Sequence, residues 1–134
     1  MVTNETVPNE TVPDGSDPHE LAHWLFDRAR AGEGDLVAAY VDAGAPVDLS
    51  DADGNTLLML AAYHGHADAV SALADRGADP NALNNRGQSP LAGAVFKDEQ
   101  AVIDALLSAG ADPDLGQPTA RQTAEMFGRS DLFT

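Results

Sequence analysis

The sequence has no cysteine, only seven basic residues and few aromatic ones. The lack of cysteine excludes a disulfide framework and any zinc site built from thiolates. Because aromatic residues make up 5% of the chain and hydrophobic residues 43%, a core must consist mainly of small aliphatic side chains. A chain of 134 residues can form one compact domain, and such a core favours closely stacked helices over a large sheet sandwich.

Long apolar runs are also absent. No stretch approaches the roughly 18 consecutive apolar residues of a membrane-spanning helix, and no apolar signal segment follows Met1. We therefore expect a cytoplasmic protein without a membrane partner.

The charge balance is strongly acidic, with 22 acidic residues and a formal net charge of -15. A field of this sign repels nucleic acid and anionic lipid, so nucleic acid is not expected as a partner. Acidity of this kind ordinarily serves solubility or reflects an acidic host proteome. It also steers a chain toward basic surfaces, which leaves an acidic inhibitor or a mimic of nucleic acid as an alternative function.

The first residues contain a five-residue unit written twice, "NETVPNETVP". Repeated proline, low hydrophobicity and acidic residues without basic ones predict a disordered acidic tail over residues 1–16. Order should begin at Asp17, a good helix N-cap, followed by Pro18 at the first helical position. The folded domain is thus expected over residues 17–134.

A 33-residue period governs the rest of the chain. Gly44, Gly77 and Gly110 recur at this spacing, within the related segments "DAGAPVD", "DRGADPN" and "SAGADPD". The same offset extends through the unit, because it pairs Gly54 with Gly87, Thr56 with Ser89, Leu58 with Leu91 and Ala61 with Ala94. An internal repeat of this length predicts a solenoid of stacked units.

Each unit carries the signals of two short helices. In the second unit Thr56 caps a helix expected over residues 57–64, which Gly65 ends in the left-handed conformation. A second helix is expected over residues 67–76, with Gly77 closing it. Its apolar residues follow helical spacing, at Val70, Leu73 and Ala74. Helices this short are not stable alone in water, so stacking must stabilise them.

The stretch "GNTLLMLAAYHGHADAVSALADRGADPNA", residues 54–82, resembles the ankyrin repeat, whose marker is T-P-L-H-x-A within a 33-residue unit. The resemblance extends from about Asp17 to the C-terminus. It implies an all-α ankyrin-repeat solenoid of helix-turn-helix units joined by β-hairpin-like loops. About four repeats are expected, at 17–50, 51–83, 84–115 and a shortened 116–134.

Some positions depart from the family pattern. Leu57 and Met59 replace the family's proline and histidine, and Ala92 replaces the histidine of the next unit, so these units should be less stable than a consensus repeat. Asp98 stands where Gly65 stands one unit earlier. Because aspartate tolerates the left-handed region better than most residues, the turn should survive.

The last unit matches the second unit at an offset three positions short of two full periods, which indicates a shortened loop before it. Its second helix is also cut short. One expectation is that this edge exposes apolar side chains and is covered by a second copy or another partner. The other is that a short final helix packs well enough to close the core. The side chains concerned are Leu106, Leu107, Met126 and Phe133.

No catalytic constellation is found, and we predict neither an enzyme nor a cofactor. His64 and His66 in "YHGHAD" lack further ligands nearby, and the resemblance gives His66 a structural role. His19 and His23 lie four positions apart on one helix face, which leaves a metal-binding or enzymatic protein built on that face as an alternative. No metal site is predicted.

The resemblance implies a non-enzymatic protein-binding module, whose concave face combines the hairpin tips with the exposed side of the first helix of each unit. Its partner is an unidentified protein, and the acidity of the chain would favour a basic one. Tyr63 and Phe96 stand out as aromatic side chains at solvent-facing positions, unless they pack along their own repeat. The candidate contact residues are Ala52, Asp53, Asn55, Tyr63, His64, Asn85, Arg86, Gln88, Phe96 and Lys97.

Overall fold

The computed structural model describes residues 17–133, so the predicted tail over residues 1–16 lies outside the described part. Within that part the regular elements are helices, and strands are absent. This confirms the predicted all-α architecture of paired helices. The elements are α1 (Pro18–Arg30), α2 (Gly34–Asp42), α3 (Leu57–Tyr63), α4 (Ala67–Ala74), α5 (Pro90–Phe96), α6 (Gln100–Ser108), α7 (Ala120–Met126) and the 3-10 helix η3 (Ser130–Phe133).

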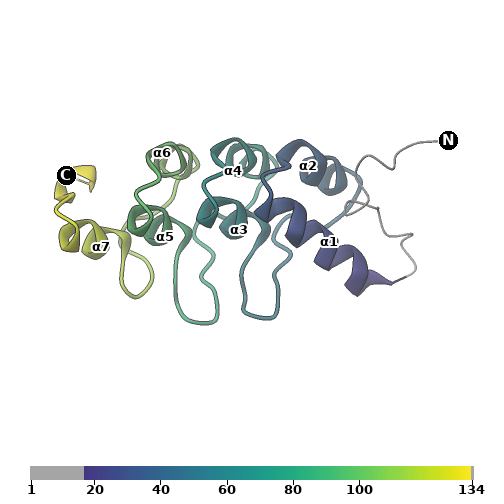
Figure 1. Ribbon diagram of the computed structural model, residues 1–134, viewed down its shortest axis with the longest axis horizontal. Coiled ribbons are helices and arrows are strands. Elements are labelled where there is room, and N and C mark those ends of the chain that lie inside the picture. The colour runs from purple at the N-terminus through teal and green to yellow at the C-terminus, as the bar shows by residue number, and fades with distance from the viewer. Residues whose placement is uncertain (1–16, 134) are drawn as a thin grey trace.

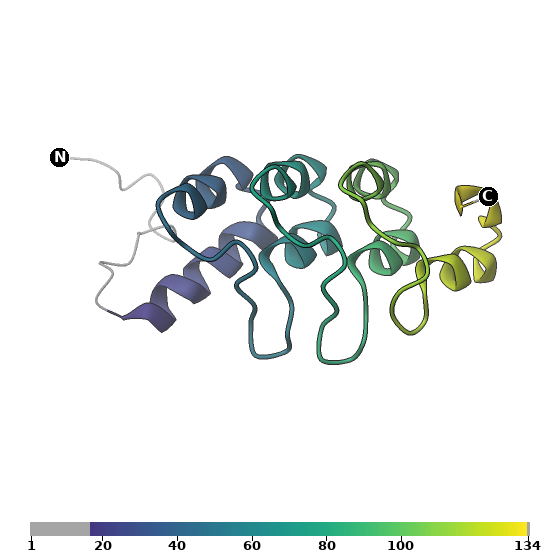
Figure 2. The ribbon, with the colours of Figure 1, turned by 180° about the vertical axis from the view of Figure 1, so that it is seen from behind.

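The helices form two layers. Helices α1, α3, α5 and α7 lie in one row, and α2, α4 and α6 lie in a second row against it (Figure 1). The loops that join α2 to α3, α4 to α5 and α6 to α7 project to the same side, beyond the first row (Figure 2). We call the first row the inner helices and the second row the outer layer. Each of α1, α3 and α5 packs against the outer helix that follows it in the chain, and neighbouring inner helices pack against one another.

Buried hydroxyl groups begin the inner helices of the central units. The hydroxyl oxygen of Thr56 accepts a hydrogen bond from the Met59 N–H at 3.1 Å, as predicted, and Ser89 accepts one from the Ala92 N–H at 3.1 Å. Each bond satisfies one of the backbone donors that a helix leaves free at its start. Thr119 caps α7 in the same way, at 3.0 Å from the Gln122 N–H.

The turns between paired helices use the left-handed backbone conformation. Gly65 has φ of 82°, and Asp98 at the equivalent position has φ of 56°, as expected for this departure from glycine. The Asp98 carboxylate also accepts a hydrogen bond from Arg129 at 2.7 Å. Helix α4 ends at Ala74, two positions before the predicted end, and a turn leads to Gly77.

The projecting loops are hairpins held by single side chains. The Asp51 carboxylate accepts hydrogen bonds from the backbone N–H groups of Asp53 and Asn55, and the Asn84 side-chain oxygen does the same one unit later. The two hairpins are also joined, because Asn85 donates its backbone N–H to the Asp53 carbonyl at 2.9 Å. The loops therefore sit in a fixed register along the solenoid.

The core runs along the interface between the two layers and is made of small aliphatic side chains, as the composition predicts. Trp24 covers the N-terminal end of this core, with its ring centre 5.2 Å from that of Tyr40. The largest fully buried side chains are Leu25, Leu57, Leu58, Leu73, Leu91, Ile103, Leu106, Val37, Val70 and Val102.

The short final helix covers part of the C-terminal edge, as the second of the two expectations has it. Leu132 and Phe133 of η3 pack partly buried against the core, and the Arg121 guanidinium donates a hydrogen bond to the Phe133 carbonyl. The expectation that Leu106 is exposed was wrong, because α6 packs this side chain fully inward against α4 and α5. Leu107 is 37% exposed and Met126 is 66% exposed, as expected for part of this edge.

Candidate functional site

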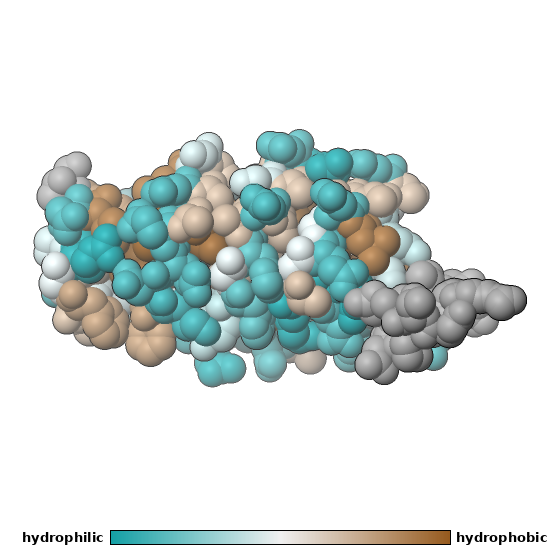
Figure 3. Space-filling view, turned by 45° about the horizontal axis from the view of Figure 1, so that its top comes forward, coloured by the Kyte–Doolittle hydropathy of each residue, from teal (hydrophilic) through white to brown (hydrophobic). Residues whose placement is uncertain are grey.

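A groove of about 540 Å³ runs across α3, α5 and α7, and the hairpins form one of its walls. In contrast, hydrophilic side chains break the apolar surface into small patches on the face shown in Figure 3, which includes α2, α4 and α6. The groove is lined by Asn55, Met59, Leu60, Tyr63, Asn84, Arg86, Gln88, Ser89, Pro90, Ala92, Gly93, Phe96, Pro118, Thr123 and Met126.

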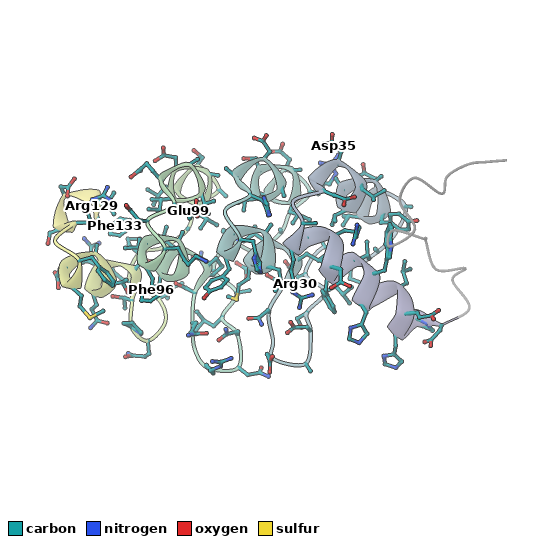
Figure 4. All side chains as sticks on the ribbon, in the orientation of Figure 1. Arg30, Asp35, Phe96, Glu99, Arg129 and Phe133 are labelled. Carbon is teal, nitrogen blue, oxygen red and sulfur yellow. The ribbon has the colours of Figure 1, made fainter. Side chains whose placement is uncertain are left out.

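Two aromatic side chains rise from the last residues of α3 and α5. Tyr63 is 47% exposed and Phe96 is 60% exposed, and they occupy equivalent positions one full period apart. Lys97 holds its Nζ 4.4 Å from the centre of the Tyr63 ring, and the Phe127 ring lies 5.6 Å from the Phe96 ring, which sits beside α7 in Figure 4. Each ring is thus braced by the following unit while about half of it faces solvent.

Met126 extends this series. Met126, whose side chain is exposed, occupies the position in α7 that Phe96 occupies in α5, once the three positions lost in the last loop are taken into account. One side chain from each of α3, α5 and α7 therefore projects into the same groove. The shortened offset was the signal that could have placed Met126 in the groove, whereas we expected it only at the C-terminal edge.

The hairpin wall carries a network of side-chain amides. Asn84 donates through Nδ2 to the Asn55 Oδ1 at 3.0 Å and to the Gln88 Oε1 at 2.8 Å. The Asn84 Oδ1 is itself occupied, since it accepts the N–H groups of Arg86 and Gln88. The Asn84 amide is thus fully used, the Asn55 Oδ1 and the Gln88 Oε1 each keep one lone pair, and the Gln88 Nε2 and the Arg86 guanidinium are available to donate to a ligand.

The structure places the predicted contact residues in two groups. Those that line the groove are Asn55, Tyr63, Arg86, Gln88 and Phe96. The others lie next to it. Asn85 donates its side-chain amide to the Ala52 carbonyl at 3.0 Å, and Asp53 lies next to Ala52 in the preceding hairpin. His64 and Lys97 contact the Tyr63 ring.

Sequence reasoning missed several lining residues because they come from positions that it treated as structural. Met59 stands where the family pattern has histidine, and Gly93 leaves the middle of α5 without a side chain. Pro118 and Thr123 belong to the last unit, where the shortened period hid their register. All four are among the residues that line the groove.

Positive groups gather at the end of α3. Burial, followed by the charges of Lys97, Arg30 and His66, lowers the pKa of His64 below its ordinary value of 6.5. His66 has a structural role, since its Nε2 lies 2.8 Å from the Arg30 carbonyl oxygen at the end of α1. This bond ties the first unit to the second.

The alternative site on α1 has no supporting cluster. His19 and His23 are exposed, and among residues 17–133 no group of three or more histidine, cysteine, aspartate or glutamate side chains is placed to hold a metal ion. In the same part of the chain, no helix is long and apolar enough to cross a membrane.

Stacked helix pairs with a 33-residue period, hairpins projecting to one side and a groove beside them define a repeat solenoid of the ankyrin type. The family model described as ankyrin repeats, three copies, matches residues 25–117, which is more than half of the chain. The protein therefore belongs to the ankyrin-repeat family. Ankyrin repeats generally act as protein–protein interaction modules and are typically not enzymes.

A relative supports the same assignment. A stretch of 46 residues is 44% identical to a Pseudomonas aeruginosa protein named as a "putative ankyrin repeat protein". The stretch makes up 34% of this chain and 27% of that protein, so the chain matches only about a quarter of the relative's length.

Proposed function

We propose that the chain is a non-enzymatic binding module whose groove, together with the hairpin tips, holds a segment of a protein partner. The observation that carries this proposal is the alignment of Tyr63, Phe96 and Met126 from three successive units along one groove. Exposed aromatic side chains contribute strongly to binding because they bury a large area at a small entropic cost. The hydrogen-bonded wall beside them orients a partner without further ordering of the hairpins.

The test uses variants matched in kind. Purified wild-type chain, the double variant Tyr63→Ala/Phe96→Ala and the control Leu107→Ala are used to capture proteins from lysate of the host cell, and retained proteins are quantified by mass spectrometry. Leu107 is also exposed and apolar, but it lies on α6 in the outer layer. We expect a set of proteins retained by the wild type and by Leu107→Ala to be lost with the double variant. Equal capture by all three would overturn the groove as the binding site.

The acidic-inhibitor hypothesis predicts a different salt response. Binding through the net charge of -15 to a basic surface should weaken steeply as salt rises, since opposite charges on exposed surfaces are screened. Binding anchored on Tyr63 and Phe96 should persist. Capture that disappears between low and high salt, and that ignores the aromatic substitutions, would favour the inhibitor over the groove.

Self-association through the C-terminal edge is a second candidate, favoured by the exposure of Met126 and Phe127. Light scattering over a range of concentrations tests it. A mass that rises with concentration in the wild type and stays at one chain in Phe127→Asp would support a second copy as the cover for this edge. A constant mass of one chain in the wild type would exclude it.

A further inference from the structure

The groove differs in charge from the rest of the chain. Acidic residues number 22 of 134, yet none of the residues that line the groove is acidic. Arg86 is the single charged lining residue. A groove that excludes carboxylates in so acidic a chain is poorly matched to a basic segment.

Most of the basic side chains are engaged elsewhere. Arg28 pairs with Glu33, Arg30 with Asp27 and Asp51, Arg76 with Asp42, Arg121 with Asp114, and Arg129 with Asp98 and Asp131. Among the lysine and arginine side chains of residues 17–133, only Arg86 and Lys97 have no carboxylate within ion-pair distance. One lines the groove, and the other covers the Tyr63 ring beside it.

Hydrogen-bond donors on the groove wall also favour a negatively charged ligand. The Gln88 Oε1 already accepts from Asn84, the Gln88 Nε2 is free to donate, and the Arg86 guanidinium consists of donors only. Beside the groove, at the end of α3, burial and then the charges of Lys97, Arg30 and His66 lower the pKa of His64. Donors and positive charge on an apolar floor fit a ligand with negatively charged acceptors.

We infer that the groove takes a peptide segment in which carboxylate side chains accompany apolar ones. The apolar side chains pack on Tyr63, Phe96 and Met126, and the carboxylates pair with Arg86 at the hairpin end and with Lys97 at the end of α5. This inference rests on the proposed function and names the chemistry of its partner. The net charge of the chain opposes the approach of such a segment only weakly at physiological salt, where charges more than about 8 Å apart are largely screened.

Selection from a library of random twelve-residue peptides displayed on phage tests the inference with the full chain at physiological salt. We expect the selected peptides to be enriched in aspartate and glutamate together with aromatic, leucine, isoleucine or methionine residues. Selected peptides rich in lysine and arginine, or without a charge preference, would overturn the inference. Failure to enrich any peptide would also count against it, since the proposed ligand is a linear segment.

Variants locate the charge effect. The affinity of a selected peptide should fall at least about tenfold with Arg86→Glu, because a charge-assisted hydrogen bond becomes a repulsion. The control Arg76→Glu makes the same change in net charge on the outer layer, where Arg76 pairs with Asp42, and should have little effect. Equal losses with both variants would mean that the peptide responds to net charge alone, against the inference.

The aromatic variants separate this inference from the proposed function. Peptides that need Tyr63 and Phe96 but show no preference for carboxylates would support the groove as the binding site and contradict the proposed acidic ligand. Peptides that bind Tyr63→Ala/Phe96→Ala as well as they bind the wild type would instead remove the groove itself.

Discussion

Buried hydroxyl groups at Thr56 and Ser89 hold the first turns of α3 and α5, and they give the most local prediction. Thr56→Ala removes the acceptor of the Met59 N–H inside the core, and should lower the free energy of unfolding by about 1 kcal/mol. Thr56→Ser keeps the hydroxyl and should recover most of that loss. Urea denaturation followed by circular dichroism measures both, and an unchanged midpoint for Thr56→Ala would show that the cap contributes nothing.

The surroundings of His64 predict a titration. Burial is the first cause of its lowered pKa, and the charge of Lys97 is the second. Lys97→Met should therefore raise the pKa of His64 toward its ordinary value, as followed by NMR titration of the imidazole resonances. A pKa that stays constant or falls would mean that Lys97 does not lie close to His64 in solution.

The same shift has a defined effect on stability. Because the pKa of His64 is lower in the folded chain than in the unfolded one, the unfolded state binds the proton first as pH falls. The contribution of His64 is complete above about pH 6.5, and it is lost as pH falls through the lowered pKa. Lys97→Met should make this loss smaller.

Local signals made some residues predictable and long-range register hid others. The Thr56 cap follows from its place just before a helix, and the left-handed Asp98 follows from its alignment with Gly65 one unit earlier; both were predicted. The hydrogen bond from Asn84 to Asn55 depends on how two hairpins align side by side, which no local pattern indicates. The contact of Lys97 with Tyr63 likewise joins side chains of different units.

At the scale of elements, Gly93 is a helix-interior glycine with room for a side chain. An added Cβ would lie 3.7 Å from the Tyr63 Cδ1, an ordinary contact, and the backbone of Gly93 is helical. Since glycine costs about 1 kcal/mol relative to alanine inside a helix, Gly93→Ala should stabilise the chain by up to about that amount. Thermal unfolding measures the gain; a lower melting temperature would indicate that α5 has no space for the methyl group.

Gly34 at the start of α2 predicts the opposite. An added Cβ there would lie 2.7 Å from the Ala69 Cα, so the backbones of α2 and α4 would have to move apart. Overpacking of this kind costs about 1–3 kcal/mol. Gly34→Ala should therefore lower the melting temperature under conditions in which Gly93→Ala raises it, and equal effects would contradict the packing of the two outer helices.

The elements themselves were largely predictable from the repeat period. The exceptions lie where that period breaks. The last unit ends in η3, whose Leu132 and Phe133 pack partly against the core. The inward position of Leu106 depends on how α6 packs against α4 and α5. The shortened second helix of the last unit therefore does not leave Leu106 exposed.

At the scale of the whole molecule, ion pairs and hydrogen bonds join successive units of the solenoid. Arg76 reaches back to Asp42 in the preceding unit, and Arg129 reaches back to Asp98. Both pairs are largely exposed, so each contributes little, and the hydrogen bonds between neighbouring hairpins hold successive units in one alignment. The three projecting side chains of the groove depend on that alignment, because each comes from a different unit.

The most direct test of this account is the affinity of a captured partner for three forms of the chain, measured by isothermal titration calorimetry. If Tyr63 and Phe96 act as hot spots, the Kd of Tyr63→Ala/Phe96→Ala should exceed that of the wild type by at least about 30-fold, which corresponds to about 2 kcal/mol. Leu107→Ala should bind as the wild type does. A double variant whose Kd stays within about twofold of the wild-type value, with the fold intact by circular dichroism, would contradict the groove as the recognition surface.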